Sequence, residues 1–210
     1  MVKNDSEKQT EEKIFEAALA VFEEKGFAAA RMQEIADRAG INKALLHYYF
    51  RSKDHLFDAV FDKRLGDMFS KIIGIFMTDK PFEEKIREYY REHISFFEKN
   101  PRLPNFILSE IAHNPEALAK RFSNVNYSAL KDSLLRESRK ESAEYNIKPE
   151  DWPQLMITIV SLTVFPFAAQ EVLKMVLAKT GGGDFNKFMD ERKTYAANFV
   201  MNSLKYREQK

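Results

Sequence analysis

The sequence contains no cysteine among its 210 residues, so it has neither a disulfide framework nor thiolate chemistry. It also lacks an excess of either charge, because 33 lysines and arginines balance 32 acidic residues and leave a net charge of +1. General basicity is therefore excluded as a way of binding polyanions, and any such binding must come from a local patch. The polar N-terminus does not look like a signal peptide, so we expect a cytoplasmic protein.

Catalytic and metal-binding motifs are lacking as well. The four histidines, His47, His55, His93 and His113, do not have the spacing of metal ligands. There is no phosphate-binding glycine loop, nucleophile elbow or HExxH sequence, and the glycines at 181–183 follow no predicted strand, which indicates a linker. We expect no enzyme, no metal site and no cofactor.

The composition and the hydrophobic period indicate an all-α protein. Hydrophobic residues make up 44% of the chain and charged residues 31%, as in globular proteins. Apolar residues recur with the helical period, no β-alternation or repeat is present, and the pattern predicts about nine helices and no sheet. At this length the chain can hold one large domain or two small ones.

Residues 32–50, MQEIADRAGINKALLHYYF, are expected to form two short helices joined by a tight turn. Gly40 suits the left-handed conformation that ends a helix, and Asn42 is a good N-cap for a helix that starts at Lys43. This pattern predicts a helix-turn-helix, whose second helix enters the DNA major groove. On the turn alone, an ordinary pair of packed helices is an equally good interpretation.

The charges around this turn favour DNA. Residues 38–53 contain four positive side chains and no acid. The positive residues are Arg38, Lys43, Arg51 and Lys53, and the interleaved aromatic residues are His47, Tyr48 and Tyr49. Cations and hydrogen-bonding aromatics together suit phosphates and base edges.

The stretch IADRAGINKALLHYYFRSKDHLF resembles the N-terminal signature of TetR-family (tetracycline-repressor-like) regulators, IA..AGVS.GTLY.YF.SKE.L. With the preceding helix, EEKIFEAALAVFEEKGF, the resemblance covers roughly residues 10–60. The sequence departs from the family pattern at Ala30, where a helix-capping Thr is usual, and at Asn42, Ala44, Leu45 and His47. Leu45 and His47 lie on the helix that would read DNA.

This resemblance implies a three-helix DNA-binding head, residues 1–52, and a larger helical ligand-binding and dimerisation body, residues 53–210. The predicted DNA-contacting residues are Arg31, Asn42, Lys43, Ala44, Leu45, His47, Tyr48, Tyr49, Ser52 and Lys53. Residues 43–48 would face the groove, apart from Leu46, whereas Tyr49, Lys53 and the N–H groups after Ser52 would hold phosphates. Leu46 and Phe50 are predicted core residues.

The body contains most of the 18 phenylalanines. A plain core explains any single one, but the resemblance implies a pocket for an apolar or aromatic ligand among the middle helices. The candidate ligand-binding residues are Phe69, His93, Phe97, Phe106, Ser109, Phe165 and Gln170. His93 lies on the apolar face of its predicted helix, where a satisfied core histidine is the alternative.

Residues 154–170 carry no charge, and their length is at the lower limit for a membrane span. A helix at about 149–177, kinked at Pro166 and buried in a core or a subunit interface, is the better interpretation. With a last helix at about 184–204, it would form a four-helix bundle with a second copy, as the resemblance also implies.

We therefore predict a ligand-responsive transcriptional regulator, a repressor that binds a palindromic operator as a homodimer and is released by a small apolar or aromatic molecule. The alternative is a helical adaptor that acts through protein partners. The departures at Leu45 and His47 motivate this alternative.

Overall fold

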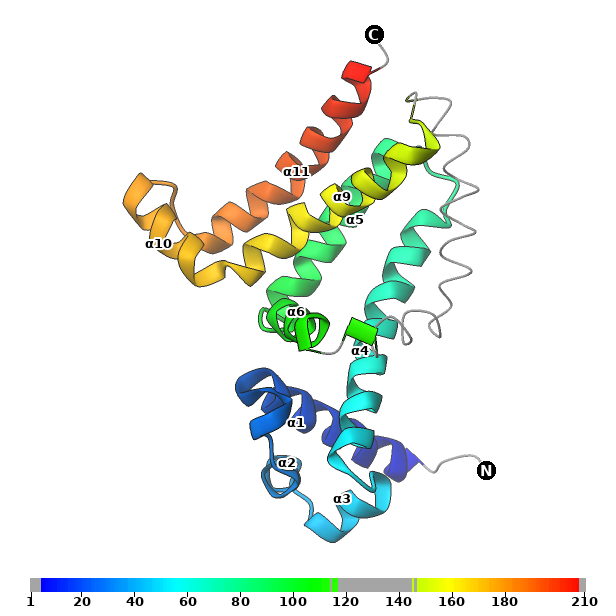
Figure 1. Ribbon diagram of the computed structural model, residues 1–210, viewed down its shortest axis with the longest axis vertical. Helices are drawn as coiled ribbons and strands as arrows, with labels where there is room; N and C mark the ends of the chain where they lie inside the picture. Colours follow the sequence, from blue (N-terminus) through cyan, green and yellow to red (C-terminus); the bar gives the residue numbers. More distant parts are fainter. Residues whose placement is uncertain (1–4, 114, 117–144, 146, 208–210) are drawn as a thin grey trace. The chain divides into compact units, whose positions relative to one another are not determined.

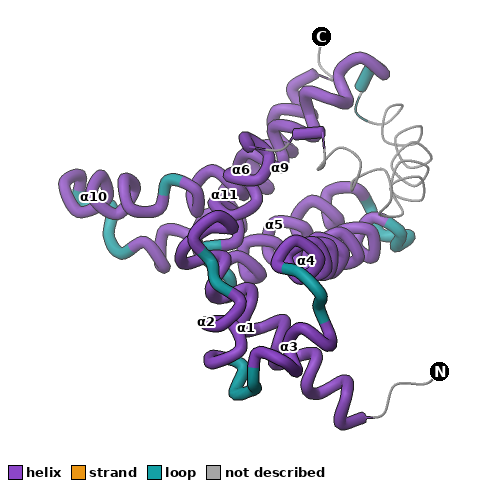
Figure 2. The backbone as a smooth tube through the Cα atoms, turned by 60° about the horizontal axis from the view of Figure 1, so that its bottom comes forward, coloured by secondary structure: helices purple, strands orange, loops and turns teal. Residues whose placement is uncertain are grey.

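The computed structural model describes residues 5–113, 115–116, 145 and 147–207. This part of the chain contains α-helices and one 3-10 turn and no strand, so the all-α class is confirmed (Figures 1 and 2). The elements are α1 (Asp5–Ala29), α2 (Met32–Arg38), α3 (Lys43–Tyr49), α4 (Lys53–Phe76), α5 (Phe82–Lys99), α6 (Leu103–His113), η1 (Pro149–Asp151), α9 (Trp152–Ala168), α10 (Gln170–Thr180) and α11 (Phe185–Arg207). The helical stretch expected between about 115 and 145 lies almost entirely outside the described residues.

The chain divides into two compact units, Met1–Phe69 and Ser70–Lys210. The division falls within α4, because the first half of this helix contributes Leu56, Val60 and Leu65 to buried positions. The structural units therefore separate at a later residue than the functional boundary expected at residue 52, which stays a prediction.

The N-terminal unit is built on α1. Ile14, Ala18 and Phe22 are almost fully buried along one stripe, as the helical period predicted. The Phe22 ring meets Phe57 of α4 edge to face, with centroids 5.1 Å apart. The helix starts at Asp5, earlier than expected, and Gly26 interrupts it with a φ of 74° that favours glycine.

In the second unit α5 packs against α9 and α11 (Figure 1). Tyr90 of α5 is fully buried, and its hydroxyl donates a hydrogen bond of 3.2 Å to the Ile159 carbonyl of α9. Phe97 and Phe167 extend the same contact, with ring centroids 5.5 Å apart. These aromatic residues form the core that holds the C-terminal helices.

The prediction of a single kinked helix at 149–177 is wrong. The helix α9 ends at Ala168, and the axis of α10 is bent by 80° relative to that of α9. Pro166 has no N–H, so the Leu162 carbonyl one turn earlier loses its helical donor. Arg192 of α11 replaces that donor, with its Nε 2.9 Å from the Leu162 oxygen. No single helix in the described part is long and apolar enough to cross a membrane, while α9 and the sharply bent α10 meet that test only as a pair, by length and composition.

The Arg192 contact is expected to contribute measurably to stability. In Arg192→Met, which keeps an apolar stem but removes the donor, the free energy of unfolding should fall by about 1–2 kcal/mol. The same change made together with Pro166→Ala should cost less, because residue 166 then offers its own N–H to Leu162. Urea unfolding of the four proteins of this cycle measures the coupling, and an equal cost in both backgrounds would contradict the assignment.

Candidate DNA-binding surface

The turn between α2 and α3 has the predicted local geometry. Gly40 adopts a φ of 68°, and the Ile41 N–H donates to the Ala36 carbonyl at 3.0 Å, which closes the end of α2. The Asn42 Oδ1 accepts a hydrogen bond of 2.7 Å from the Leu45 N–H, so the expected N-cap of α3 is confirmed. These bonds set the direction in which α3 leaves the turn.

The α3 helix presents one face outward because one residue anchors the other face. Leu46 is completely buried and Phe50 nearly so, as predicted for core residues. The exposed side chains of α3 are Lys43, Ala44, Leu45, His47 and Tyr48. Tyr48 is 78% exposed, and its ring meets the half-buried Tyr49 edge to face at 5.6 Å. All the residues predicted to face the groove are therefore accessible.

The positive charge of this region is smaller than the sequence indicated. Arg38 makes a bidentate ion pair with Glu24 of α1, in which both N–O distances are 2.9 Å. This hydrogen bonding raises the pKa of Arg38 above its usual value. Among the described residues Lys43 and Arg51 have no such partner and are exposed, so their charges remain accessible beside α3.

Lys53 lies in a different environment from the phosphate contact expected for it. Its Nζ donates to three backbone carbonyls, those of Phe27 at 2.8 Å and of Ala28 and Ala30 at 3.2 Å. The ammonium group also lies 4.5 Å from the centroid of the Phe27 ring. Three acceptors use the three donors of an ammonium group, so this geometry gives Lys53 a structural role at the junction of α1 and α2.

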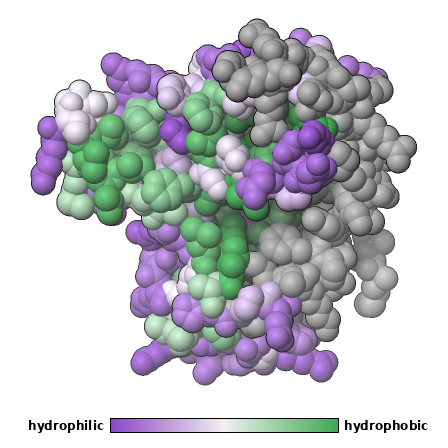
Figure 3. Space-filling model, turned by 45° about the horizontal axis from the view of Figure 1, so that its top comes forward, coloured by the Kyte–Doolittle hydropathy of each residue, from purple (hydrophilic) through white to green (hydrophobic). Residues whose placement is uncertain are grey.

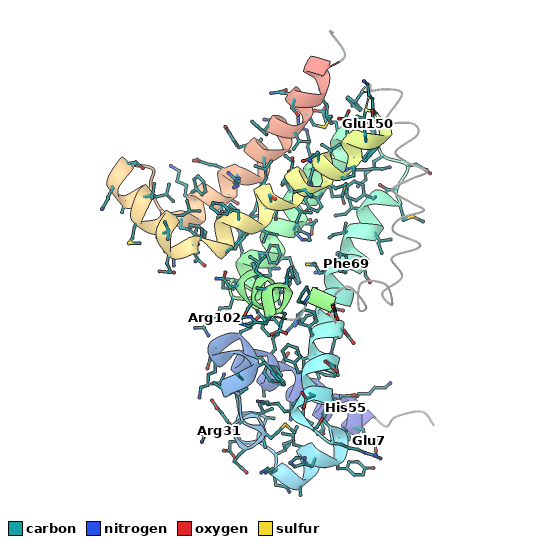
Figure 4. All side chains as sticks on the ribbon, viewed as in Figure 1. Glu7, Arg31, His55, Phe69, Arg102 and Glu150 are labelled. Carbon is teal, nitrogen blue, oxygen red and sulfur yellow. The ribbon has the colours of Figure 1, made fainter. Side chains whose placement is uncertain are left out.

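The remaining predicted residues flank α3. Arg31, labelled in Figure 4, precedes α2 with an exposed side chain, and α2 has no side-chain cap. The Ser52 hydroxyl oxygen accepts a hydrogen bond of 3.1 Å from the His55 N–H and so caps α4 as expected. The His47 Nδ1 lies 3.4 Å from the Arg51 carbonyl oxygen. Contacts of these residues with DNA stay predictions.

In the second unit His93 lies in an aromatic cluster. It is 6% exposed and stacks on Tyr89 at 4.9 Å, while Phe97 meets it edge to face at 5.1 Å. Burial, assisted by the positive charge of Lys71, lowers the pKa of His93 to about 4. Burial likewise raises the pKa of Tyr89 to about 12, an effect that the neighbouring Thr163 hydroxyl opposes only in part.

The other candidate ligand-binding residues differ in their exposure, and their contact with a ligand stays a prediction. Phe97 and Phe106 are buried, Phe69 and Gln170 are half-buried, and Ser109 is exposed. Phe165 is 62% exposed on α9, unlike its buried neighbour Phe167. In the described part of the chain no group of three or more His, Cys, Asp or Glu side chains could hold a metal ion.

The low pKa of His93 makes stability depend on pH in a defined direction. The unfolded chain, with a histidine pKa near 6.5, binds this proton more readily than the folded protein. The contribution is therefore fully present above pH 6.5 and is lost as the pH falls through this range toward 4, by about 2 kcal/mol at pH 5. Urea unfolding of the wild type and of His93→Phe between pH 7 and 5 measures it, and parallel curves would contradict the prediction.

Comparison with known proteins identifies the helix-turn-helix. The family model described as "Bacterial regulatory proteins, tetR family" matches residues 14–60, which run from α1 into α4. Residues 14–60 therefore carry a domain similar to the N-terminal domain of TetR-family regulators. The chain is a helix-turn-helix transcriptional regulator, and the residues that match the family model include the α2–α3 pair described above.

The similarity of this chain to known regulators extends beyond the matched domain. The transcriptional repressor SCO4008 of Streptomyces coelicolor is 25% identical over 179 residues, 83% of this chain and 85% of its own. The transcriptional activator FasR of Mycolicibacterium smegmatis is 34% identical over 82 residues, 39% and 37% of the two chains. The structure of the regulator FadR from Bacillus subtilis, in complex with stearoyl-CoA, aligns with a TM-score of 0.63 at 15% identity and covers 89% and 97% of the chains.

Three residues that shape these surroundings were not predicted from the sequence. Glu24 neutralises Arg38 from 14 residues away, and no local pattern marks that pair. Tyr89 is one helical turn before His93 on the same apolar face, a spacing that could have indicated their stacking. The buried Thr163 had no visible signal, because it lies in an uncharged run whose faces cannot be told apart from sequence.

Proposed function

We propose that this protein is a TetR-family repressor that binds a palindromic operator as a homodimer and is released by a small apolar or aromatic molecule. One observation carries the DNA-binding part: Leu46 is buried while Lys43, Ala44 and Tyr48 on the same short helix are exposed. Such a helix can enter a major groove while Leu46 stays packed in the protein core. Its place of action is then the cytoplasm, where bacterial DNA is.

Selection of bound fragments from random duplex DNA tests this function. An enriched sequence with two-fold symmetry supports the regulator. No enriched sequence, together with a co-purifying protein, would overturn it in favour of a helical adaptor. A reporter gene under the selected sequence then distinguishes a repressor, such as SCO4008, from an activator, such as FasR.

Exposed apolar side chains on the last three helices support the dimer. Figure 3 shows hydrophobic surface gathered over α10, which extends away from α9 and α11. The exposed apolar residues here are Ile157, Val160, Phe165, Val172, Met175, Val176, Tyr195 and Phe199. Next to them a depression of about 310 Å³ on α11 is lined by Phe188, Glu191, Arg192 and Tyr195. A surface of this kind on one chain suits a second copy.

If the protein dimerises through this surface, a charged side chain introduced there should weaken the dimer. Ile157 is 62% exposed in the first half of α9, so Ile157→Glu should leave the monomer folded and shift the protein from dimer to monomer at micromolar concentration. Ile111→Glu on α6, an exposed isoleucine outside this surface, is the matched control and should remain dimeric. Sedimentation equilibrium measures both, and a dimeric Ile157→Glu would contradict the proposed interface.

The ligand is proposed from the aromatic body and from one similar structure. The Tyr89–His93–Phe97 cluster offers aromatic surface with two polar groups, as in many small-molecule sites. Because FadR from Bacillus subtilis was solved with stearoyl-CoA, that compound is a suitable first probe. Stearoyl-CoA should lower affinity for the selected operator, and native mass spectrometry should show it bound. If neither that probe nor any co-purified molecule binds, ligand control is overturned while DNA binding stands.

A further inference from the structure

The apolar part of the outward α3 face is available to a partner. Successive residues of a helix are turned by about 100°, so Ala44 lies nearly opposite the buried Leu46 and close to the centre of the exposed face. Leu45, which is 36% exposed, lies beside it. The small Ala44 side chain lets the helix backbone come near a base pair, and Leu45 then adds apolar surface at its edge.

The hydrogen-bonding groups near this apolar pair are partly occupied within the protein. Asn42 would need its Oδ1 to accept from adenine, but that oxygen already accepts from the Leu45 N–H at 2.7 Å. The His47 Nδ1 lies beside the Arg51 carbonyl. Lys43 and Tyr48 therefore remain the most accessible hydrogen-bonding side chains of α3. By the same rotation Lys43 lies on the other side of Ala44 from Leu45, whereas Tyr48 lies one turn further along the same face as the Ala44–Leu45 pair.

Among the four bases only thymine offers an apolar group in the major groove, its C5-methyl. The other major-groove edges offer donors and acceptors, and an alkyl side chain placed over them would leave those groups without partners. The chemistry of an Ala–Leu pair thus selects a thymine. The departures from the family pattern at positions 44 and 45 are what create this pair.

We propose that Ala44 and Leu45 form a methyl-reading patch, which recognises the C5-methyl group of a thymine in each half-site of the operator. This inference rests on the proposed DNA-binding function and names the base chemistry that the reading helix selects. Lys43 lies on the other side of Ala44 from Leu45. Its charge and hydrogen bonds do not depend on the thymine methyl group.

Replacing thymine by deoxyuridine in the selected operator tests the methyl-reading patch, because it removes the methyl and changes nothing else in the groove. Wild-type affinity should fall about fourfold for one half-site and about fifteenfold for both, as expected when a buried methyl contact is lost. Leu45→Ala should bind the thymine operator more weakly and lose most of this thymine-to-uracil ratio. Lys43→Ala is the matched control, since it should weaken binding to both operators and keep the ratio.

The possible outcomes distinguish a failure of the methyl-reading patch from a failure of the proposed DNA-binding function. Equal wild-type affinity for thymine and deoxyuridine operators overturns the methyl-reading patch and leaves the regulator intact. An unchanged ratio in both Leu45→Ala and Ala44→Gly overturns the assignment of the methyl contact to these residues. Failure to select any DNA sequence overturns the proposed function itself. Circular dichroism of each variant shows whether a loss of affinity reflects unfolding.

Discussion

Replacing Lys43 and Tyr48 together by alanine is expected to weaken operator binding by about three orders of magnitude or more. In the proposed complex each side chain contacts a base edge or a phosphate, such contacts contribute about 1–3 kcal/mol each, and a dimer would lose every contact twice. Neither side chain belongs to the core, because Lys43 is exposed and Tyr48 is 78% exposed. Helix content and melting temperature should therefore stay close to wild type.

A titration at several salt concentrations gives this experiment its sharpest form. The loss of Lys43 should also make affinity less dependent on salt, since one phosphate-neutralising charge is removed from each subunit. Lys99→Ala, which removes an exposed charge from α5, is the control and should leave both the affinity and its salt dependence unchanged. Unaltered binding by the double variant would refute α3 as the reading helix.

The second large effect is expected from Lys53→Ala, and it is an effect on stability. The three carbonyls that accept from the Lys53 Nζ belong to the segment between Gly26 and α2, where the helical hydrogen bonds of α1 end. The N-cap of α2 is Arg31, not Ala30 as the family resemblance implied, and its side chain makes no capping hydrogen bond. Removal of the ammonium group should therefore lower the free energy of unfolding by about 2–4 kcal/mol.

Lys63→Ala provides the matched control for this prediction. Lys63 also belongs to α4 and also lies over a phenylalanine, 4.7 Å from the Phe15 centroid, but its partner is the exposed carboxylate of Glu12. An exposed pair of this kind contributes less than about 1 kcal/mol. Thermal unfolding compares the two variants. Equal, small shifts in melting temperature, with a loss of DNA affinity in Lys53→Ala only, would restore the phosphate contact that the sequence indicated.

Features determined by neighbouring residues could be predicted from the sequence of this protein. The helical class, the Gly40 turn, the Asn42 and Ser52 caps and the burial of Leu46 all depend on groups within about four residues of one another. Their geometry follows from backbone conformation and helical period alone. The identity and accessibility of the α3 face could therefore be inferred from the order of its residues.

Only the tertiary structure decided which charged side chains are free. Arg38 and Lys53 belong to the same cationic run as Lys43, yet one pairs with Glu24 and the other with carbonyls 23 to 26 residues away. The packing of α9 against α11 likewise places Arg192 at the carbonyl of Leu162, 30 residues earlier in the chain, which has no helical donor. A sequence records the charge of a lysine or arginine, but its partner depends on which helices pack together. That packing is a property of the folded chain.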